Sequence, residues 1–287
     1  MDQTSAIILA ISLMIIMLGM GLSLVVDDFK RIFVQPKSII IGLVNQIIIL
    51  PIVAYILAST FSLQPEISVG LMILAACPGG PTSNLISHLA KADTALSVTL
   101  TAFSSFITIL TIPFIVNFAL ESFLDKSNVI QLDVLQTLLQ ILLIVIIPIT
   151  IGMYIRNKKE SFALKMGKPV RIASGILLVV IILGLIIKEK ETLVTSFEEA
   201  GLVVVILNLF VMFFAYYSAK LFKINNKRSL SIAIESGIQN GTLGITVAVV
   251  LLNNSTFALV SALYGVLMFI SASIAIYLGA KQKNYPN

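Results

Sequence analysis

Charged residues are scarce in this chain of 287 residues, of which only 11% are charged and 58% are hydrophobic. A soluble domain carries about 25% charged residues, so this composition excludes a soluble protein. A bilayer core about 30 Å thick needs roughly 20 apolar residues in each helix that crosses it. The lack of charge therefore predicts an all-α polytopic membrane protein with only short loops and no sizeable soluble domain.

Cysteine and histidine are nearly absent as well. Cys77 is the only cysteine, which excludes an internal disulfide, and His88 is the only histidine. Cysteine, histidine and carboxylate residues do not cluster at metal-ligand spacing. The sequence also lacks a pair of membrane aspartates and a serine with a plausible histidine partner, so we expect no enzymatic activity.

Uninterrupted apolar stretches predict nine membrane spans. The first is too long for the core of a signal peptide and has no basic segment before it, so we expect it to be retained. Because no transit peptide precedes it, we favour a prokaryotic inner cell membrane over an organelle. The nine spans are expected at about residues 5–26, 37–59, 67–90, 94–120, 132–155, 170–187, 200–219, 229–252 and 255–280.

The basic residues lie almost entirely on one side of this topology. Of the 19 Lys and Arg residues, all but Lys126, Lys188 and Lys190 follow spans 1, 3, 5 or 7 or belong to the C-terminus. Basic loops are retained in the cytoplasm, so the N-terminus is expected outside and the C-terminus inside. The net charge of +5 then serves topology and contact with membrane lipid, and indicates neither nucleic acid nor an obligate protein partner.

One carboxylate, Glu235, remains in the middle of a span. Its insertion costs about 2.5 to 3.5 kcal/mol, so we expect it to face a polar cavity. The alternative is a structural carboxylate that is hydrogen-bonded between helices. The stretch from Glu235 to Thr242 also contains two glycines and several amide or hydroxyl side chains, which predicts that this span is broken.

A second interruption is expected in the third span, where residues 77–84 contain two prolines and two glycines. Non-helical backbone at membrane depth is tolerated only where protein or a water-filled cavity satisfies its polar groups. The two breaks lie five spans apart and therefore cross the membrane in opposite directions, as corresponding elements of an inverted repeat would.

Polar side chains in spans 2 and 4 add to these breaks. In span 2, Asn45 and Gln46 precede Pro51. In span 4, hydroxyl side chains recur on one helix face. The hydroxyls of Thr108 and Thr111 are expected to bond carbonyls of their own helix. Oxygen ligands of this kind suit Na⁺, and the N-termini of half-helices favour an anion. The charges of Glu235 and two monovalent cations would sum to +1, which a bound monoanion could neutralise. The hydroxyl residues are Thr94, Ser97, Thr101, Ser104, Ser105, Thr108 and Thr111.

These ordered motifs resemble the bile acid:sodium symporter family, whose bacterial members are homologues of the apical sodium-dependent bile acid transporter. The resemblance covers nearly the whole chain. It is carried by Met17–Leu22 with Asp28 and Phe29, Gln46 with Pro51, Cys77–Gly80 with Ser83 and Asn84, Leu89–Lys91, Ala95–Val98 with Thr101, and Glu235 with Gly237, Gln239 and Asn240.

The resemblance implies an inverted-repeat transporter with two discontinuous crossing helices, spans 3 and 8. This chain is similar to the nine-span form that lacks the first helix of a ten-helix fold. A core domain would contain spans 2–4 and 7–9, about residues 37–120 and 200–280. A panel domain would contain spans 1, 5 and 6, about residues 5–26 and 132–187. Rocking of one domain against the other would give alternating access.

The resemblance also implies two sodium sites, residue by residue. The first would use Ser83, Asn84, Ser97, Thr101 and Glu235, and the second Gln46, Glu235, Ser236, Ile238 and Gln239. Thr82 and Asn240 would lie beside the substrate. Pro81 stands where many relatives have Thr, and Met268 and Phe269 stand where some carry a His-Asn pair, so this chain departs from the family on the substrate side.

The implied function is symport of an organic anion with, we expect, two Na⁺ ions. The substrate would be bile-acid-like or a small carboxylate such as pantoate or a keto acid. Two alternatives stay open: a proton-coupled organic anion carrier in which Glu235 titrates, and a membrane sensor that does not transport.

Overall fold

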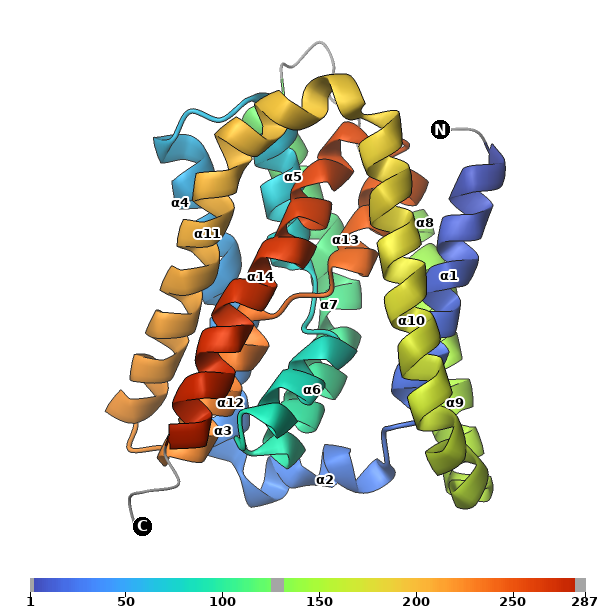
Figure 1. Ribbon diagram of the computed structural model, residues 1–287, viewed down its shortest axis with the longest axis vertical. Helices are drawn as coiled ribbons and strands as arrows, with labels where there is room; N and C mark the ends of the chain where they lie inside the picture. Colours follow the sequence, from blue (N-terminus) through green and yellow to red (C-terminus); the bar gives the residue numbers. More distant parts are fainter. Residues whose placement is uncertain (1–2, 125–131, 282–287) are drawn as a thin grey trace.

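The computed structural model describes residues 3–124 and 132–281, and within these ranges every regular element is a helix (Figure 1). Five helices are long and apolar enough to cross a membrane, or up to seven if each of two bent helix pairs counts as one span. The predicted all-α membrane protein is therefore confirmed. The five are Pro36–Thr60, Thr94–Phe123, Val134–Lys158, Phe197–Leu221 and Thr256–Lys281.

Both predicted interruptions are present. Helix α5 (Pro65–Ala76) ends before the first proline, and α6 (Pro81–Leu89) begins at the second, where the missing N–H costs no helical hydrogen bond. Three residues separate helix α12 (Asn226–Gly237) from α13 (Gly241–Thr246), which continues into the π-helical turn η3 (Val247–Leu251). Two apolar segments, Pro65–Ala76 and Gly241–Leu251, are thus too short to cross a membrane alone.

The two breaks contact each other at the centre of the molecule (Figure 1). The backbone N–H of Asn240 donates to the carbonyl of Pro78 at 2.9 Å. Gly79 and Gln239 form an isolated antiparallel bridge. Backbone groups that the helices leave unpaired are therefore paired across the crossing, as apolar surroundings require.

Helices α1 (Gln3–Gly21), α9 (Ile147–Lys158) and α10 (Glu160–Lys188) pack together on one side of the molecule (Figure 1). Helix α8 (Val134–Ile141) leads through the π-helical turn η2 (Leu142–Ile146) into α9. Glycines permit the close crossing of α1 and α9, because a Cβ at Gly152 would meet backbone atoms of Leu18, Gly21 and Leu22.

The other helices surround the two breaks. They are α3 (Pro36–Val44), the π-helical turn η1 (Asn45–Ile49), α4 (Leu50–Thr60), α5, α6, α7 (Thr94–Phe123), α11 (Lys190–Leu221), α12, α13 and α14 (Thr256–Lys281). Within this group, α4, α5, α11, α12 and α14 bury an apolar cluster that includes Leu71, Leu207, Ile234 and Tyr264. The short helix α2 (Val26–Val34) turns away from α1 by 63° and exposes Phe33.

Several span boundaries differ from the prediction. The first helix ends at Gly21 rather than near residue 26, and α10 and α11 begin about ten residues before the expected positions 170 and 200. Hydropathy identifies the apolar part of a helix, whereas polar helical ends continue beyond it and escape that signal. Lys126 and the C-terminal Lys283, which entered the topology prediction, lie outside the described residues.

Replacement by Ala is expected to change stability in opposite directions at two glycines, Gly152 at the α1–α9 crossing and Gly175 in α10. Ala is favoured over Gly in a helix interior by about 1 kcal/mol. Nothing lies within 4 Å of a Cβ added at Gly175. Gly175→Ala should therefore leave the melting temperature unchanged or raise it. Gly152→Ala should lower stability by about 1–3 kcal/mol, because the added methyl group displaces the backbone of α1. Thermal denaturation in detergent measures both, and a Gly152 variant as stable as the parent would contradict the proposed close crossing.

Candidate functional site

The carboxylate of Glu235 lies in the last turn of α12 and is 1% exposed. Ser97 Oγ donates to its Oε2 at 2.9 Å, and Thr101 Oγ1 donates to its Oε1. Ser97 and Thr101 stand one turn apart on α7, so a single helix face presents both hydroxyls. The structure therefore brings two of the predicted ligands, Ser97 and Thr101, to the buried carboxyl group of a third, Glu235.

Helix α6 adds Ser83 and Asn84 to this group. Asn84 Oδ1 lies 3.0 Å from Ser97 Oγ and 3.1 Å from Thr101 Oγ1. Ser83 Oγ donates to the carbonyl of Gly80 at 2.7 Å and lies 3.4 Å from Thr101 Oγ1. All five predicted ligands of the first site are thus brought together.

The hydroxyls of this group face more acceptor oxygens than they have hydrogens to donate. Ser97 has one hydroxyl hydrogen but lies within hydrogen-bond distance of two acceptors, on Asn84 and Glu235. Thr101 likewise has one hydrogen for the Asn84 and Glu235 side chains and the Ser97 carbonyl. The oxygens outnumber the hydrogens that could bond them, and a monovalent cation with oxygen ligands would supply the missing positive charge.

A second set of polar atoms surrounds Gly79. Gln46 and Gln239 are each 1% exposed, and the side-chain oxygen of each has no hydrogen-bond partner within the described part of the chain. A Cβ at Gly79 would overlap the Glu235 carboxylate and lie 3.2 Å from Gln46 Nε2, so both side chains border this glycine. Buried polar atoms without partners are rare, and each costs about 1–3 kcal/mol.

The local backbone explains how these glutamines reach one place. Gln46 belongs to the π-helical turn η1, and Gln239 lies in the break, where its Nε2 donates to the Ser236 carbonyl at 2.7 Å. That bond occupies the amide nitrogen and leaves the amide oxygen available. The structure thus brings the Gln46 and Glu235 side chains to Gly79, whose backbone pairs with Gln239, and Ser236 and Ile238 are buried in the adjoining backbone.

The predicted substrate residues fall into two groups. Pro81 and Thr82 are half-buried in the first turn of α6, next to Gly80, whose added Cβ would lie 3.5 Å from Asn240 Cα. Met268 is buried in the apolar cluster of Leu71 and Tyr264, whereas Phe269 is 44% exposed. The first group thus lies at the crossing, and the second extends from it along α14.

The other residues singled out by the sequence lie outside the Glu235 group. Cys77 is buried and donates to the carbonyl of Ile73 at 3.2 Å, and His88 is exposed near the end of α6. Thr108 and Thr111 bond carbonyls of their own helix, as expected. Among the described residues, no group of three His, Cys, Asp or Glu side chains is arranged to hold a metal ion.

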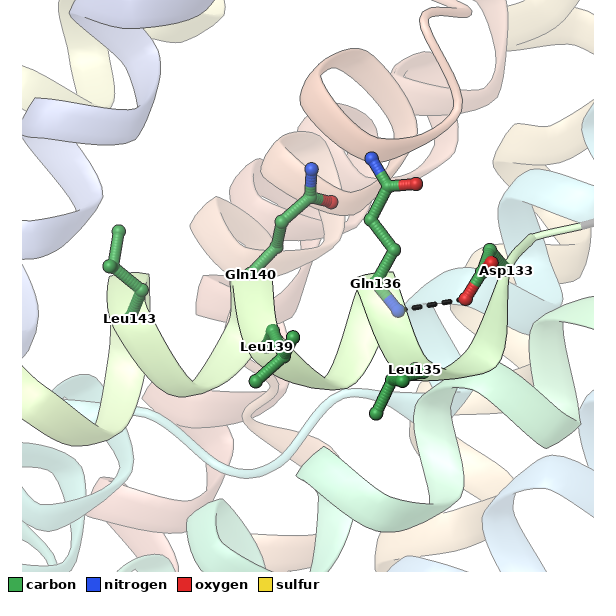
Figure 2. A pocket seen from close by; sticks show the side chains of 6 residues that line it. All are labelled: Asp133, Leu135, Gln136, Leu139, Gln140 and Leu143. Atoms are coloured by element: carbon green, nitrogen blue, oxygen red, sulfur yellow. Dashed lines mark hydrogen bonds between the residues drawn. The ribbon is translucent and has the colours of Figure 1, made fainter.

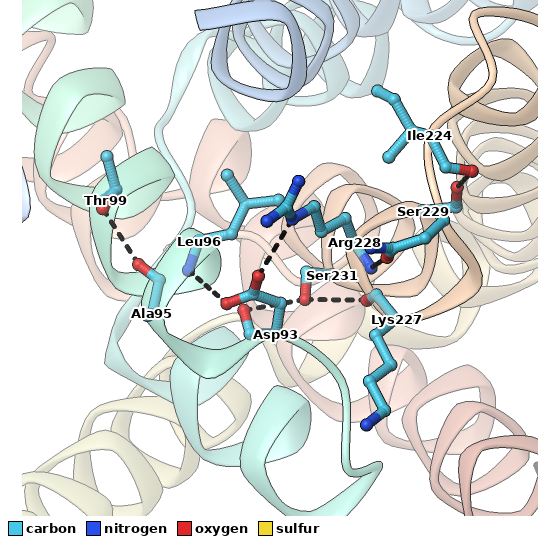
Figure 3. Close-up of polar contacts among 10 residues, drawn as sticks. Asp93, Ala95, Leu96, Thr99, Ile224, Lys227, Arg228, Ser229 and Ser231 are labelled. Carbon is cyan, nitrogen blue, oxygen red and sulfur yellow. Dashed lines mark hydrogen bonds and ion pairs between the residues drawn. The ribbon is translucent and has the colours of Figure 1, made fainter. Parts of the chain in front are cut away.

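Sequence reasoning missed a polar clamp between the starts of α7 and α12 (Figure 3). Asp93 accepts from the N–H of Leu96 at 3.0 Å, lies 3.3 Å from Arg228 Nε, and receives the Ser231 hydroxyl on its carbonyl at 2.9 Å. An N-cap signal was present in the sequence, because an aspartate precedes an apolar helix. The partner 135 residues away carried no such signal.

A groove of about 390 Å³ runs along α8 and is lined by one face of that helix (Figure 2). Asp133 at its end accepts from the N–H of Gln136 and caps the helix. The groove contains none of the predicted site residues and is separate from the crossing. Its lining residues are Asp133, Leu135, Gln136, Leu139, Gln140 and Leu143.

Gly79 offers a test of the convergence of Gln46 and Glu235. Gly79→Ala should weaken sodium binding at least about tenfold, since its methyl group would occupy the position of the Glu235 carboxylate. The measurement is the sodium concentration that gives half of the rise in melting temperature of the purified protein. Gly80→Ala is the matched control, because its methyl group meets Asn240 at an ordinary 3.5 Å. Equal sodium responses of the two variants would contradict the arrangement.

Comparison with known proteins identifies relatives over most of the chain. The model of the sodium bile acid symporter family matches residues 10–196. An uncharacterized sodium-dependent transporter, YocS, of Bacillus subtilis is 33% identical over 277 residues, 96% of this chain and 84% of that protein. A probable sodium/metabolite cotransporter, BASS1, of Arabidopsis thaliana chloroplasts is 29% identical, over 92% of this chain and 64% of that protein.

A third relative is the ileal sodium/bile acid cotransporter of Cricetulus griseus. It is 28% identical over 246 residues, which are 84% of this chain and 68% of that protein. The chain therefore spans less than two thirds of the Arabidopsis protein but more than two thirds of the bacterial and hamster proteins.

Proposed function

The chain belongs to the sodium bile acid symporter family, and from this premise we propose that it is a symporter that couples Na⁺ to the transport of an organic anion by alternating access. The family is one of sodium-coupled membrane transporters and not of enzymes. The observation that carries the proposal is the buried Glu235 carboxylate, which lies where two helix breaks meet and is surrounded by oxygen-rich side chains.

Two sodium ions are proposed to bind at this crossing. The first site consists of Ser83, Asn84, Ser97, Thr101 and Glu235, and the second of Gln46, Glu235, Ser236, Ile238 and Gln239. The surplus of acceptors in the first set and the partnerless glutamine oxygens in the second support this division. Two sodium ions with one carboxylate carry a net charge of +1, which a bound monoanion neutralises, so ions and substrate stabilise one another in the low-dielectric site.

The substrate is proposed to bind beside the crossing, near Thr82 and Asn240. Pro81 removes one N–H donor from the start of α6. If the substrate site extends along α14, Met268 and Phe269 would make that part of the site apolar. Two relatives are named as cotransporters of metabolites and of bile acid. We therefore propose an organic anion with one carboxylate, either bile-acid-like or as small as pantoate or a keto acid.

Alternating access is proposed to use two groups of helices. Helices α1 and α8–α10 would form the panel, and α3–α7 and α11–α14 the core that carries the ion ligands. The packing of α1 on α9 and α10 supports the panel. Each break is followed by an uninterrupted helix, α7 or α14, and this order supports an inverted repeat within nine spans.

The orientation is likewise a proposal, with the N-terminus outside and the C-terminus in the cytoplasm of a prokaryotic inner cell membrane. Helix α2, the end of α9 and the start of α12 lie at the same end of the molecule (Figure 1). They carry Lys30, Arg31, Arg156, Lys227 and Arg228 at that end, and this supports a cytoplasmic side.

Glu235→Ala should reduce sodium-dependent uptake to background, because the negative charge common to both ion sites is lost. Thr101→Ala should raise the sodium concentration for half-maximal uptake about tenfold, since a hydrogen bond to a charged group contributes about 1.5–3 kcal/mol. Uptake into proteoliposomes under an imposed sodium gradient measures both. The matched control is Thr108→Ala, which removes a hydroxyl that bonds only its own helix. Uptake driven equally by a proton gradient without sodium would instead support the proton-coupled alternative.

A thermal-shift screen of the purified protein against organic anions tests the substrate and its coupling together. An anion that is transported should raise the melting temperature in sodium and not in potassium, because each ligand strengthens the binding of the other. Stabilisation that is the same in both salts would contradict sodium coupling. Stabilisation without any uptake into proteoliposomes would support a sensor.

A further inference from the structure

The break after α12 leaves the carbonyl of Gly237 without its helical partner. The helix is regular up to that point, since the N–H of Ile238 donates to Ile234 at 2.8 Å. In a continuous helix the N–H of Gly241 would bond the Gly237 carbonyl, but here it donates to Gln239 at 3.0 Å. Gly237 is buried, so its carbonyl must find another donor or bear the cost of desolvation.

Two side chains from different helices supply those donors. Asn208 on α11 donates from Nδ2 to the Gly237 carbonyl at 2.7 Å, and Tyr264 on α14 donates its hydroxyl to the same oxygen at 2.7 Å. Asn208 Nδ2 also lies 2.9 Å from Tyr264 Oη. The two amide hydrogens and the phenolic hydrogen are therefore all used within one buried triangle.

The opposite side of the break is held by the other broken helix. Asn240 bonds Pro78, and Gln239 pairs with Gly79, which borders Glu235 and Gln46. The three residues 237–239 are thus fixed between α11 and α14 on one side and the α5–α6 break on the other. The ion ligands Glu235 and Gln239 flank the carbonyl that the triangle binds.

We propose that Asn208 and Tyr264 are positioning residues for sodium: by holding the Gly237 carbonyl toward α11 and α14, they direct Glu235 and Gln239 toward Gly79. The inference rests on the proposed function. It adds two residues that touch neither the ions nor the substrate and act through the backbone of the break. The bound Gly237 oxygen is also withdrawn from the possible ion ligands, whereas the Gln239 side-chain oxygen stays without a partner among the described residues.

The test compares Tyr264→Phe and Asn208→Leu with two matched controls. Tyr264→Phe keeps the ring and removes the hydroxyl bonds to Gly237 and Asn208, and Asn208→Leu removes the amide at similar volume. Asn117→Leu loses a half-buried amide that bonds the Leu132 backbone at 2.8 and 3.1 Å, far along α7 from the break. Ser271→Ala loses a hydroxyl of α14 that bonds only Met268.

Sodium alone is titrated into each purified protein, and the concentration for half of the rise in melting temperature is recorded. We expect this concentration to rise about three- to tenfold in each single variant, since each loses one bond to the Gly237 carbonyl and the bond between the two side chains. The double variant should shift the concentration further than either single variant, because only then does the buried Gly237 carbonyl lose both donors. At saturating sodium, the KM for the organic anion should be that of the parent.

The outcomes separate this inference from the proposed function. If the parent protein is not stabilised by sodium, the proposed function fails. If the parent responds and the Asn208 and Tyr264 variants respond at the same sodium concentration, the positioning role is overturned while the function stands. If Asn117→Leu and Ser271→Ala shift the sodium concentration equally, the effect is general destabilisation, and the positioning role is again overturned.

Discussion

A carboxylate in the middle of an apolar segment is the constraint on which the rest of the structure depends. Glu235 must be compensated by charge or by hydrogen bonds, because its transfer into low dielectric is unfavourable. The two α7 hydroxyls provide part of that compensation, and Asn84 completes a shell of oxygens around them. A cation among these oxygens would bind the surplus acceptors and neutralise the buried carboxylate. The location of Glu235 is in this way linked to a function in ion coupling.

The helix breaks follow from the same constraint. An intact α12 would use its carbonyls internally and bring only one side chain in each turn to the ion site. Interrupting α12 and the facing α5–α6 segment lets Gly79 approach Glu235 and Gln46 closely, with no side chain between them. Several of the backbone groups that are released have nearby partners: Pro78 with Asn240, Gly79 with Gln239, and Gly237 with Asn208 and Tyr264.

The packing away from the crossing has a different character. Helices α1 and α9 meet through small residues, which allow close van der Waals contact where lipid offers no hydrophobic driving force. The apolar contact between these helices and α7, α13 and α14 contains Met17, Ile112, Leu243 and Phe257, and its core is aliphatic and aromatic. Polar, directional contacts thus concentrate around the breaks. The contacts of α1 and α9 with α7, α13 and α14 in this cluster are non-directional, and surfaces of this kind can shift relative to one another at lower cost than a hydrogen-bonded network.

The sequence by itself determined the membrane class, the positions of both breaks, the isolated carboxylate and the helix face that meets it, because hydropathy, proline, glycine and a 3.6-residue period are local properties. It also carried enough ordered motifs to indicate the family. The tertiary structure decided the partners of the break. Asn208 and Tyr264 lie in largely apolar helices, 29 and 27 residues from Gly237, and nothing in their neighbours distinguishes them from any other buried amide or phenol. The same is true of Arg228 opposite Asp93. A hydrogen bond between distant segments depends on how the helices pack, and a local pattern contains no record of that packing.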